Sequence, residues 1–174
     1  VSEVAGYSSA RVAASELDKS TFVGVDNLVA NKGGRIDATY LPNTSRLTSY
    51  QVGDVLIGNI RPYLKKVWLA TNSGGCSGDV LAIRIKAGEI QGLLPKFLYY
   101  LLSSDDFFAF NMKTAKGAKM PQGDKNAILN YRIPVPPREV QQEIVRILDQ
   151  FKELEAELEA ELEARRRQYH HYRA

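Results

Sequence analysis

The feature that most constrains this chain is a periodic apolar stripe near its C-terminus. From residue 140 to residue 172, apolar or aromatic side chains recur at steps of three and four residues, with one additional four-residue step. The stripe consists of Val140, Ile144, Ile147, Phe151, Leu154, Leu158, Leu162, Tyr169 and Tyr172, and Arg165 occupies the intervening position. Heptad spacing with a single stutter predicts one long helix with one apolar face.

The length of this helix determines what else the chain needs. A helix from Arg138 to Arg173 would be about 54 Å long at 1.5 Å per residue, which is more than a small domain can cover. Pro136 and Pro137 suit its start, because a proline in the first turn lacks only an amide that would have no partner there. We therefore expect a second helix to pack on the stripe. The alternative is an arm that folds back on its own domain.

Composition and charge describe the remainder of the chain. The 174 residues are 44% hydrophobic, which predicts one globular domain in addition to the arm. From residue 138 onward, seven Lys or Arg stand against nine Asp or Glu, so the arm has a net charge of −2 and the remainder +5. A mildly basic globule fits a polyanionic partner such as nucleic acid, although this excess does not by itself select one.

The chain has no feature of an exported or membrane-spanning protein. Its one cysteine, Cys76, excludes an intramolecular disulfide and suits a reducing cytosol. No charged and apolar leader opens the sequence, and no run of 18 apolar residues occurs in it. We expect a soluble cytoplasmic protein with no membrane association.

The globule reads as a β-rich core with a few helices. Apolar and β-branched runs bounded by turn residues predict strands at residues 21–25, 54–60, 66–71 and 80–85, with a glycine-rich link at 73–78. A changed pattern from Pro95 predicts one or two helices over the sheet, followed by an exposed basic loop at 113–123. Asp124 is expected to cap a short helix ending near Leu129. The predicted fold is α+β, with a domain over residues 1–136 and a coiled-coil helix over residues 137–174.

Two segments resemble the specificity subunit of type I restriction-modification systems. They are GDVLIGNIRPYLKKVWLA at residues 53–70, and IPVPPREVQQEIVRILD at 133–149 followed by ARRRQYHHYR at 164–173. The segment FVGVDNL at 22–28 also looks like the early strand of such a target recognition domain. The usual family member has two recognition domains and two spacer helices, whereas this chain has one of each. The resemblance therefore implies a half-length specificity subunit, whether natural or excised from a longer chain.

The resemblance also implies a function and a set of partners. Members of the family bind double-stranded DNA, and separate methyltransferase and restriction-translocase subunits perform the chemistry. It therefore implies a non-catalytic chain of the bacterial or archaeal cytosol that reads one half of a bipartite target and positions those subunits. It implies no cofactor on this chain, with S-adenosylmethionine, ATP and magnesium on the partner subunits only. A homodimer joined through antiparallel arms would supply the second recognition domain.

Two basic clusters are the candidate DNA contacts. Arginine and the amide side chains can bond base edges in the major groove, and lysines more often neutralise phosphates. The alternative for such lysines is a purely solvated surface. One cluster contains Asn59, Arg61, Tyr63, Lys65 and Lys66, the other contains Lys113, Lys116, Lys119 and Gln122, and a weaker third contains Asn31, Lys32 and Arg35.

No set of residues in the sequence indicates an active site. No lysine follows an Asp or Glu by two residues, so the usual nuclease pairing is absent, and so is a phosphate-binding P-loop. Cys76 has no histidine near it in the globule, which favours a buried thiol over a nucleophile. His170 and His171 are adjacent and point about 100° apart on a helix, so they cannot share a metal. The competing function is a coiled-coil dimeric adaptor whose globule binds protein or peptide.

Overall fold

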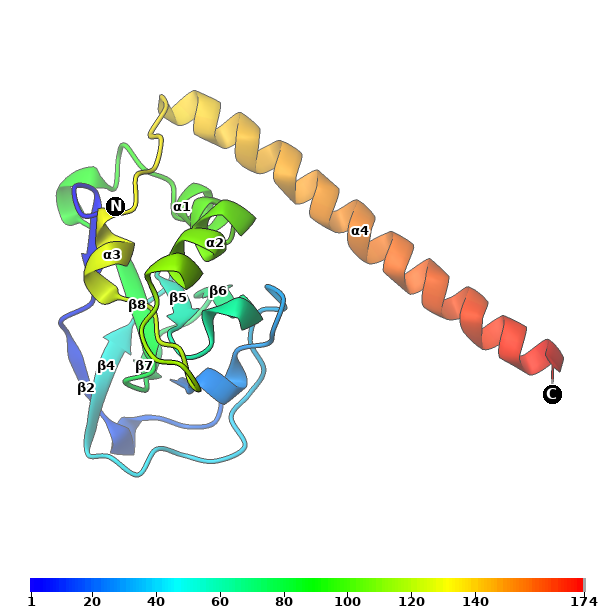
Figure 1. Ribbon diagram of the computed structural model, residues 1–174, viewed down its shortest axis with the longest axis horizontal. Coiled ribbons are helices and arrows are strands. Elements are labelled where there is room, and N and C mark those ends of the chain that lie inside the picture. The colour runs from blue at the N-terminus through cyan, green and yellow to red at the C-terminus, as the bar shows by residue number, and fades with distance from the viewer. Residues whose placement is uncertain (174) are drawn as a thin grey trace.

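The protein consists of a globule from which one long helix projects (Figure 1). The computed structural model describes residues 1–173. The globule has two four-stranded sheets, and its helices lie over one of them. This confirms the predicted α+β fold with a long C-terminal helix.

The first sheet forms the centre of the globule. Its order is β1 (Ala5–Tyr7), β8 (Val80–Ile85), β5 (Val55–Gly58) and β6 (Val67–Leu69), and all neighbours are antiparallel. Val55 and Ile57 belong to the apolar core under the helices, whereas Leu56 belongs to a second core on the other face. Since side chains alternate along a strand, the continuous apolar run of β5 reflects burial on both faces.

The second sheet packs on the other face of the first. Its order is β2 (Arg11–Ala13), β4 (Arg46–Tyr50), β7 (Gly74–Cys76) and β3 (Phe22–Val23), with β3 and β7 parallel and the other pairs antiparallel. Tyr50 and Cys76 of this sheet share an apolar cluster with Leu56 of β5. The two sheets thus enclose a common core.

The glycine-rich link predicted at residues 73–78 is not a loop throughout, because its central residues form strand β7. A Cβ atom on Gly74 would approach the carbonyl oxygen of Thr21 to 2.0 Å, and one on Gly75 would approach Val12 Cγ1 to 2.7 Å. Glycine is therefore needed for close strand packing here, rather than for a flexible link. The strand expected at 21–25 also shrinks to Phe22–Val23.

Three short helices cover the first sheet. They are α1 (Pro95–Leu102), α2 (Asp105–Thr114) and α3 (Lys125–Asn130). Asp124 accepts hydrogen bonds from the amides of Asn126 and Ala127 at 2.9 and 3.0 Å, which confirms the predicted cap of α3. The apolar faces of α1 and α2 complete the larger core with Leu98, Leu102, Phe107 and Phe108.

The long helix α4 (Arg138–Arg173) has 36 residues, as the periodicity predicts. It starts beside α1 and extends well beyond the globule (Figure 1). Within residues 1–173, none of the helices has both the length and the apolar character needed to cross a membrane. We refer to α4 as the arm.

Candidate nucleic-acid interface and helical arm

Three loops that are far apart in the sequence meet at one side of the globule. The amide of Asn31 donates to the carbonyl oxygen of Leu64 at 2.8 Å, and the amide of Lys32 donates to that of Lys65 at 2.8 Å. These bonds join the loop after β3 to the turn between β5 and β6. The first and third candidate clusters are therefore neighbours in space.

The third loop, which follows α2, joins the same turn from its other side. The amide of Arg61 donates to the carbonyl oxygen of Pro121 at 2.8 Å, and the amide of Gly123 donates to that of Asn59 at 3.1 Å. All three candidate clusters thus contribute to one surface. We call the segments 31–35, 59–66 and 113–122 together the loop surface.

The backbone of the loop surface is held in an uncommon conformation. Within residues 1–173, the non-glycine residues with positive φ are Asn31, Lys32, Arg61 and Lys65, at 55°, 61°, 52° and 50°. All four belong to the loop surface. A left-handed conformation costs a non-glycine residue about 1–2 kcal/mol, so the surrounding hydrogen bonds must impose it. Such conformations concentrate at binding sites, where they direct side chains.

The side chains of the turn between β5 and β6 differ in accessibility. Arg61 and Tyr63 are exposed at its tip. Lys66 is half-buried, and its Nζ donates to the carbonyl oxygen of Val25 at 2.8 Å. Arg61 and Tyr63 are therefore the members of this cluster that are free to meet a partner.

Asn59 is a buried member of the loop surface, with only 6% of its area exposed. Its Oδ1 and both polar atoms of the neighbouring Asn111 side chain have no partner among residues 1–173. A Cβ atom on Gly123 would come within 2.6 Å of both Oδ1 atoms, so the loop can close over them only because residue 123 is glycine. A base contact by Asn59 would require this loop to move.

The loop after α2 is a closed hairpin-like turn. Lys116 and Gln122 exchange backbone hydrogen bonds of 2.9 and 2.8 Å, and Gly117 has a φ of 99°. This closure places Lys119 on the exposed tip. Lys113 was expected in the loop but lies in the last turn of α2, because the helix continues to Thr114.

An acidic residue at the start of α2 restrains two of the lysines. The Oδ1 of Asp105 lies 3.0 Å from the Nζ of Lys32 and 3.0 Å from the Nζ of Lys65. Hydrogen bonds from Lys65 and Lys32 hold the pKa of Asp105 below its usual value. The carboxylate therefore links two loops and offsets part of their positive charge.

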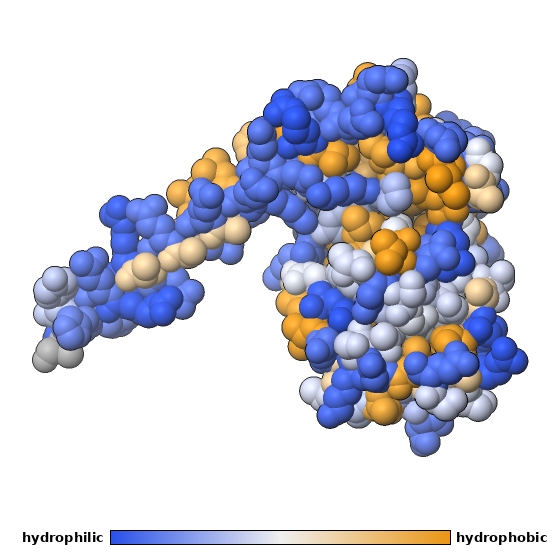
Figure 2. Space-filling model, turned by 180° about the vertical axis from the view of Figure 1, so that it is seen from behind, coloured by the Kyte–Doolittle hydropathy of each residue, from blue (hydrophilic) through white to orange (hydrophobic). Residues whose placement is uncertain are grey.

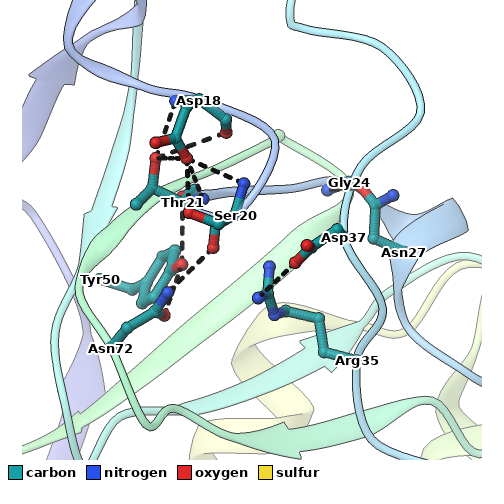
Figure 3. Close-up of polar contacts among 9 residues, drawn as sticks. All are labelled: Asp18, Ser20, Thr21, Gly24, Asn27, Arg35, Asp37, Tyr50 and Asn72. Carbon is teal, nitrogen blue, oxygen red and sulfur yellow. Dashed lines mark hydrogen bonds and ion pairs between the residues drawn. The ribbon is translucent and has the colours of Figure 1, made fainter.

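Arg35, in the third candidate cluster, faces inward rather than toward a partner. Its guanidinium bonds Asp37 at 3.1 Å and lies 5.1 Å from the ring of Trp68. Figure 3 shows it turned toward Asp37, near the polar network of Asp18, Thr21 and Tyr50. Arg35 thus packs two segments together, which weakens its candidacy as a DNA contact.

The cysteine and the two histidines are not placed where a nucleophile or a metal site would require them. Cys76 is buried in the core between the sheets, and burial raises the pKa of its thiol to about 12. The expectation of a buried thiol is confirmed. Among residues 1–173 no three His, Cys, Asp or Glu side chains are grouped as a metal site would require. His170 and His171 lie on the exposed end of the arm.

The base of the arm is attached to the globule through a buried glutamine. The Nε2 of Gln141 donates to the carbonyl oxygens of Gly92 and Pro136, both at 2.7 Å, and its Oε1 accepts from the amide of Leu94 at 3.0 Å. Gln141 is fully buried, and its side-chain amide bonds both the segment before α1 and the arm's own lead-in. Its role was not predictable from the sequence, because one glutamine in a polar helix carries no periodic signal.

A second set of contacts extends this attachment toward the middle of the arm. The carboxylate of Asp149 accepts hydrogen bonds from Tyr100 and from Lys96, the latter at 2.6 Å. The Nζ of Lys152 lies 3.0 Å from the hydroxyl of Tyr99. Although burial opposes it, hydrogen bonding from Lys96 and Tyr100 keeps the pKa of Asp149 below its usual value. About the first four turns of the arm are therefore bound to α1.

The apolar stripe remains exposed along most of the arm. The exposed fraction of its side chains runs from 39% at Ile147 to 78% at Tyr172, with Phe151 at 64%. Ile144 is the exception, because it packs against the core of its own globule. The fold-back alternative is wrong beyond the base of the arm. Ile144 was expected to contact a partner helix, but in the structure it contacts its own globule. Hydrophobic side chains also gather on the globule next to the arm (Figure 2).

Comparison with known proteins identifies similar chains. A family model described as the type I restriction modification DNA specificity domain matches residues 26–164. The specificity subunit of the type I restriction enzyme EcoDI from Escherichia coli is 29% identical over 107 residues, which are 62% of this chain and 23% of that protein.

Two solved structures share the fold. The HsdS subunit from Thermoanaerobacter tengcongensis superposes with a TM-score of 0.69 and 25% identity over 90% of this chain and 42% of that one. A chain from a study of complex assembly and conformational transition of the type I R-M system has a TM-score of 0.63 and 25% identity, over 86% of this chain and 43% of that one. This chain therefore spans less than half the length of these relatives.

Proposed function

This chain belongs to the family of type I restriction-modification DNA specificity domains, and from that membership we propose that it reads one half of a bipartite target in double-stranded DNA. The observation that carries the proposal is the meeting of three loops in one surface. Arg61 stands exposed there on a left-handed backbone that hydrogen bonds maintain. Basic loops of this kind suit the grooves and the phosphate backbone of a duplex.

We assign different roles to the side chains of the loop surface. Arg61 can donate two hydrogen bonds to one guanine, and Gln122 can pair with an adenine edge. Lys113, Lys116 and Lys119 are exposed and suit phosphates, whose contacts position the domain without carrying sequence information. Tyr63 suits apolar contact with a thymine methyl group or the sugar backbone.

The test is DNA binding by the chain assembled with its methyltransferase partner. Arg61→Ala should relax sequence preference at one position by about 1–3 kcal/mol. Lys119→Ala should instead weaken binding to all duplexes alike. It should also reduce the slope of the logarithm of the binding constant against the logarithm of salt concentration by about one, because one phosphate contact is lost. Arg132→Ala is the matched control, because Arg132 is exposed beside the N-terminal residue and outside the loop surface. Unchanged binding by both loop variants would overturn the site.

We propose further that two copies pair through antiparallel arms and present two recognition domains. The support is an exposed apolar stripe on a helix that leaves the globule. A symmetric pair would recognise an interrupted palindrome. The arm limits the separation of half-sites to roughly 16 base pairs at about 3.4 Å per pair. A monomer in concentration-dependent sedimentation would refute the pairing.

In this proposal the chemistry belongs to other subunits. The paired chains would position methyltransferase and restriction subunits, which would hold S-adenosylmethionine, ATP and magnesium. The competing adaptor function predicts no retention on duplex DNA. Salt-sensitive retention on a duplex column would therefore favour DNA recognition over the adaptor.

A further inference from the structure

We infer that the DNA-contacting area continues from the loop surface into a second hollow beside α3, and that this hollow holds the phosphate backbone of the duplex. The inference rests on the DNA recognition proposed above and adds a binding site outside the segments assigned to it. It follows from a lysine that joins the two areas, from the charges that line the hollow, and from one exposed glycine.

The hollow lies where the chain passes from one sheet to the other. Strands β1 and β2 are edge strands of the two sheets, and residues 8–10 connect them. No other strand within residues 1–173 covers their outer edges, so this side of the globule is open. We call the hollow the side groove, and together with the start of β8 it is lined by Tyr7, Ser8, Arg11, Thr48, Gly78 and Lys125.

Lys125 joins the side groove to the loop surface. It also lines an adjoining hollow together with Asn59, Lys116 and Gln122, which belong to the loop surface. The main chain connects the same two areas, because the amide of Asn59 donates to the carbonyl oxygen of Asp79 at 2.8 Å. A duplex that contacts the loop surface can therefore continue past Lys125 into the side groove.

Hydrogen bonds fix the groups that flank the side groove. The hydroxyl of Tyr7 donates to the carbonyl oxygen of Lys125 at 2.7 Å, which holds the start of α3 against β1. Arg11 is opposite Thr48 in the β2–β4 pair, and its Nη1 donates to Thr48 Oγ1 at 3.2 Å. A guanidinium has five N–H groups, so Arg11 keeps donors for an anion while Thr48 orients it.

The two cations of the side groove have no acidic partner, unlike several on the loop surface. There, Asp105 pairs with two lysines and Asp124 pairs with Lys116 at 2.6 Å. Within residues 1–173 neither Arg11 nor Lys125 forms an ion pair. Both are exposed, so their charge is available to a phosphate.

The acidic residues near this path do not cancel that charge. Asp124 lines the adjoining hollow, but its carboxylate pairs with Lys116 and accepts from the amides at the start of α3. Hydrogen bonding from Lys116 is the main reason that the pKa of Asp124 is below its usual value. Asp79 is exposed but lines neither hollow. The lining of the path therefore stays positive.

Gly78 leaves room for a close approach of the DNA backbone. A Cβ atom on this exposed residue would meet no atom within 4 Å apart from its chain neighbours. A sugar or phosphate can therefore come up to the main chain there. The φ of Gly78 is also outside the left-handed region, so other residues fit this position without strain.

The shape of the side groove indicates backbone contact rather than base readout. Base edges lie recessed in the grooves of a duplex, and a protein reaches them with a protruding helix, strand or loop. The phosphate backbone is the protruding part of the duplex, and a hollow with cations and hydroxyls at its edges suits it. Sequence readout therefore stays with the protruding loop surface, and the side groove positions the duplex.

A charge placed at Gly78 tests the inference in the chain assembled with its methyltransferase partner. Gly78→Glu should weaken binding to a random-sequence duplex about tenfold at low salt, because its carboxylate would face the phosphates. Gly88→Glu is the matched control, because a Cβ atom on that exposed glycine also meets no atom within 4 Å. Fluorescence anisotropy compares them, and equal binding by the two variants would overturn the inference.

A neutral substitution at the same position separates charge from size. Gly78→Gln has nearly the size of Gly78→Glu and should weaken binding less, because it adds no charge. An equal loss in both variants would also support the contact, through close approach of the DNA backbone to the main chain. Circular dichroism should show the same fold for all three glycine variants.

Removal of the two cations tests the site without adding a side chain. Arg11→Ala and Lys125→Ala should each weaken binding about threefold to tenfold at low salt. Each should also reduce the slope of the logarithm of the binding constant against the logarithm of salt concentration by about 0.9. Lys86→Ala is the control, because Lys86 is exposed at the opposite end of β8 from Gly78. An unchanged slope in both groove variants would overturn the phosphate contacts.

Selection from a pool of random duplexes separates this inference from the proposed function. The groove variants should select the same sequence as the wild type with lower affinity, whereas Arg61→Ala should relax it. A changed sequence in Arg11→Ala or Lys125→Ala would mean that the side groove reads bases, which would overturn its assignment to the backbone. A wild-type complex that retains no duplex would instead overturn DNA recognition itself.

Discussion

The loop surface and the arm present their functional side chains in different ways. The arm is regular, and its stripe follows from the helix period alone, so any residue of the stripe has the same backbone as its neighbours. On the loop surface, Arg61 and Lys65 have left-handed backbones that hydrogen bonds to other loops maintain. The arm can therefore change in length or register without refolding, whereas the loop surface depends on several segments at once.

The junction between the arm and the globule depends both on the regular helix and on tertiary hydrogen bonds. Gln141 belongs to the regular arm, yet it satisfies three backbone groups of the segment before α1 and of the arm's own lead-in. The direction in which the arm leaves the globule is thus determined by tertiary hydrogen bonds. Its stiffness is a property of the helix.

The largest expected effect comes from disrupting the arm stripe. Leu158→Glu should weaken dimerisation by more than about a hundredfold. It removes an apolar side chain from each arm and places two charges in the interface between the paired arms. Circular dichroism and the stability of the globule should not change. Sedimentation across concentration measures the effect, and Ala160→Glu, on the other face of the arm, is the control. An equal loss of dimerisation in both variants would mean that the two arms do not pair through the stripe.

The second effect concerns the junction. Gln141→Ala should destabilise the globule by about 1–3 kcal/mol, since it removes three hydrogen bonds to partly buried backbone groups of Gly92, Leu94 and Pro136. Urea unfolding of the monomeric Leu158→Glu background measures this without coupling to dimerisation. Gln142→Ala, at the exposed neighbouring position, should be neutral within about 0.5 kcal/mol. A neutral Gln141→Ala would show that the arm is not anchored through this residue.

A smaller effect is expected from the acidic residue that restrains the loop surface. Asp105→Asn should raise non-specific DNA affinity about threefold to tenfold at low salt, because Lys32 and Lys65 are released from their carboxylate partner. Asp106→Asn removes the same charge from the next residue, which is also exposed. Fluorescence anisotropy with a random duplex compares the two. Equal gains would mean that total charge matters and that the pairing does not.

The smallest effect is a pH dependence at the arm base. Because the pKa of Asp149 is lowered in the folded chain, its stabilisation is present above the ordinary aspartate value of about 3.9 and is lost as pH falls through the folded value. Below about pH 4, the protection of α4 amides near residue 149 against hydrogen exchange, relative to the intrinsic rate at each pH, should therefore fall. The fall should correspond to less than about 1 kcal/mol of local stability. Asp149→Asn should remove this acid-dependent change. Persistence of the same change in the variant would assign it to another group.

Some elements of the fold were predictable from local signals. The stripe predicted α4, the run Val80–Ile85 predicted β8, and Asp124 predicted the start of α3. Strand β7 was missed because Gly74 and Gly75 are poor strand formers whose strand conformation depends on neighbours from distant parts of the chain. Strands β1 and β4 were missed for a related reason, since their short segments show no clear alternation.

The candidate DNA site shows a similar division. The residue types at Arg61, Lys65 and Lys119 indicated basic loops, but nothing local indicated that these loops meet. Asn59 has a residue type suited to base readout, and only the packing of Gly123 over it places it beneath the surface. Its role in DNA contact stays a prediction.

The sequence by itself determined the long helix with its apolar face, because this depends on spacing along the chain, and its contiguous motifs indicated the resemblance to DNA specificity subunits. The tertiary structure decided which face of that helix the globule covers, and it brought three distant loops into one surface. Periodicity is a property of neighbouring residues. Pairing between remote segments depends on the complete set of buried contacts and hydrogen bonds, which no single stretch contains.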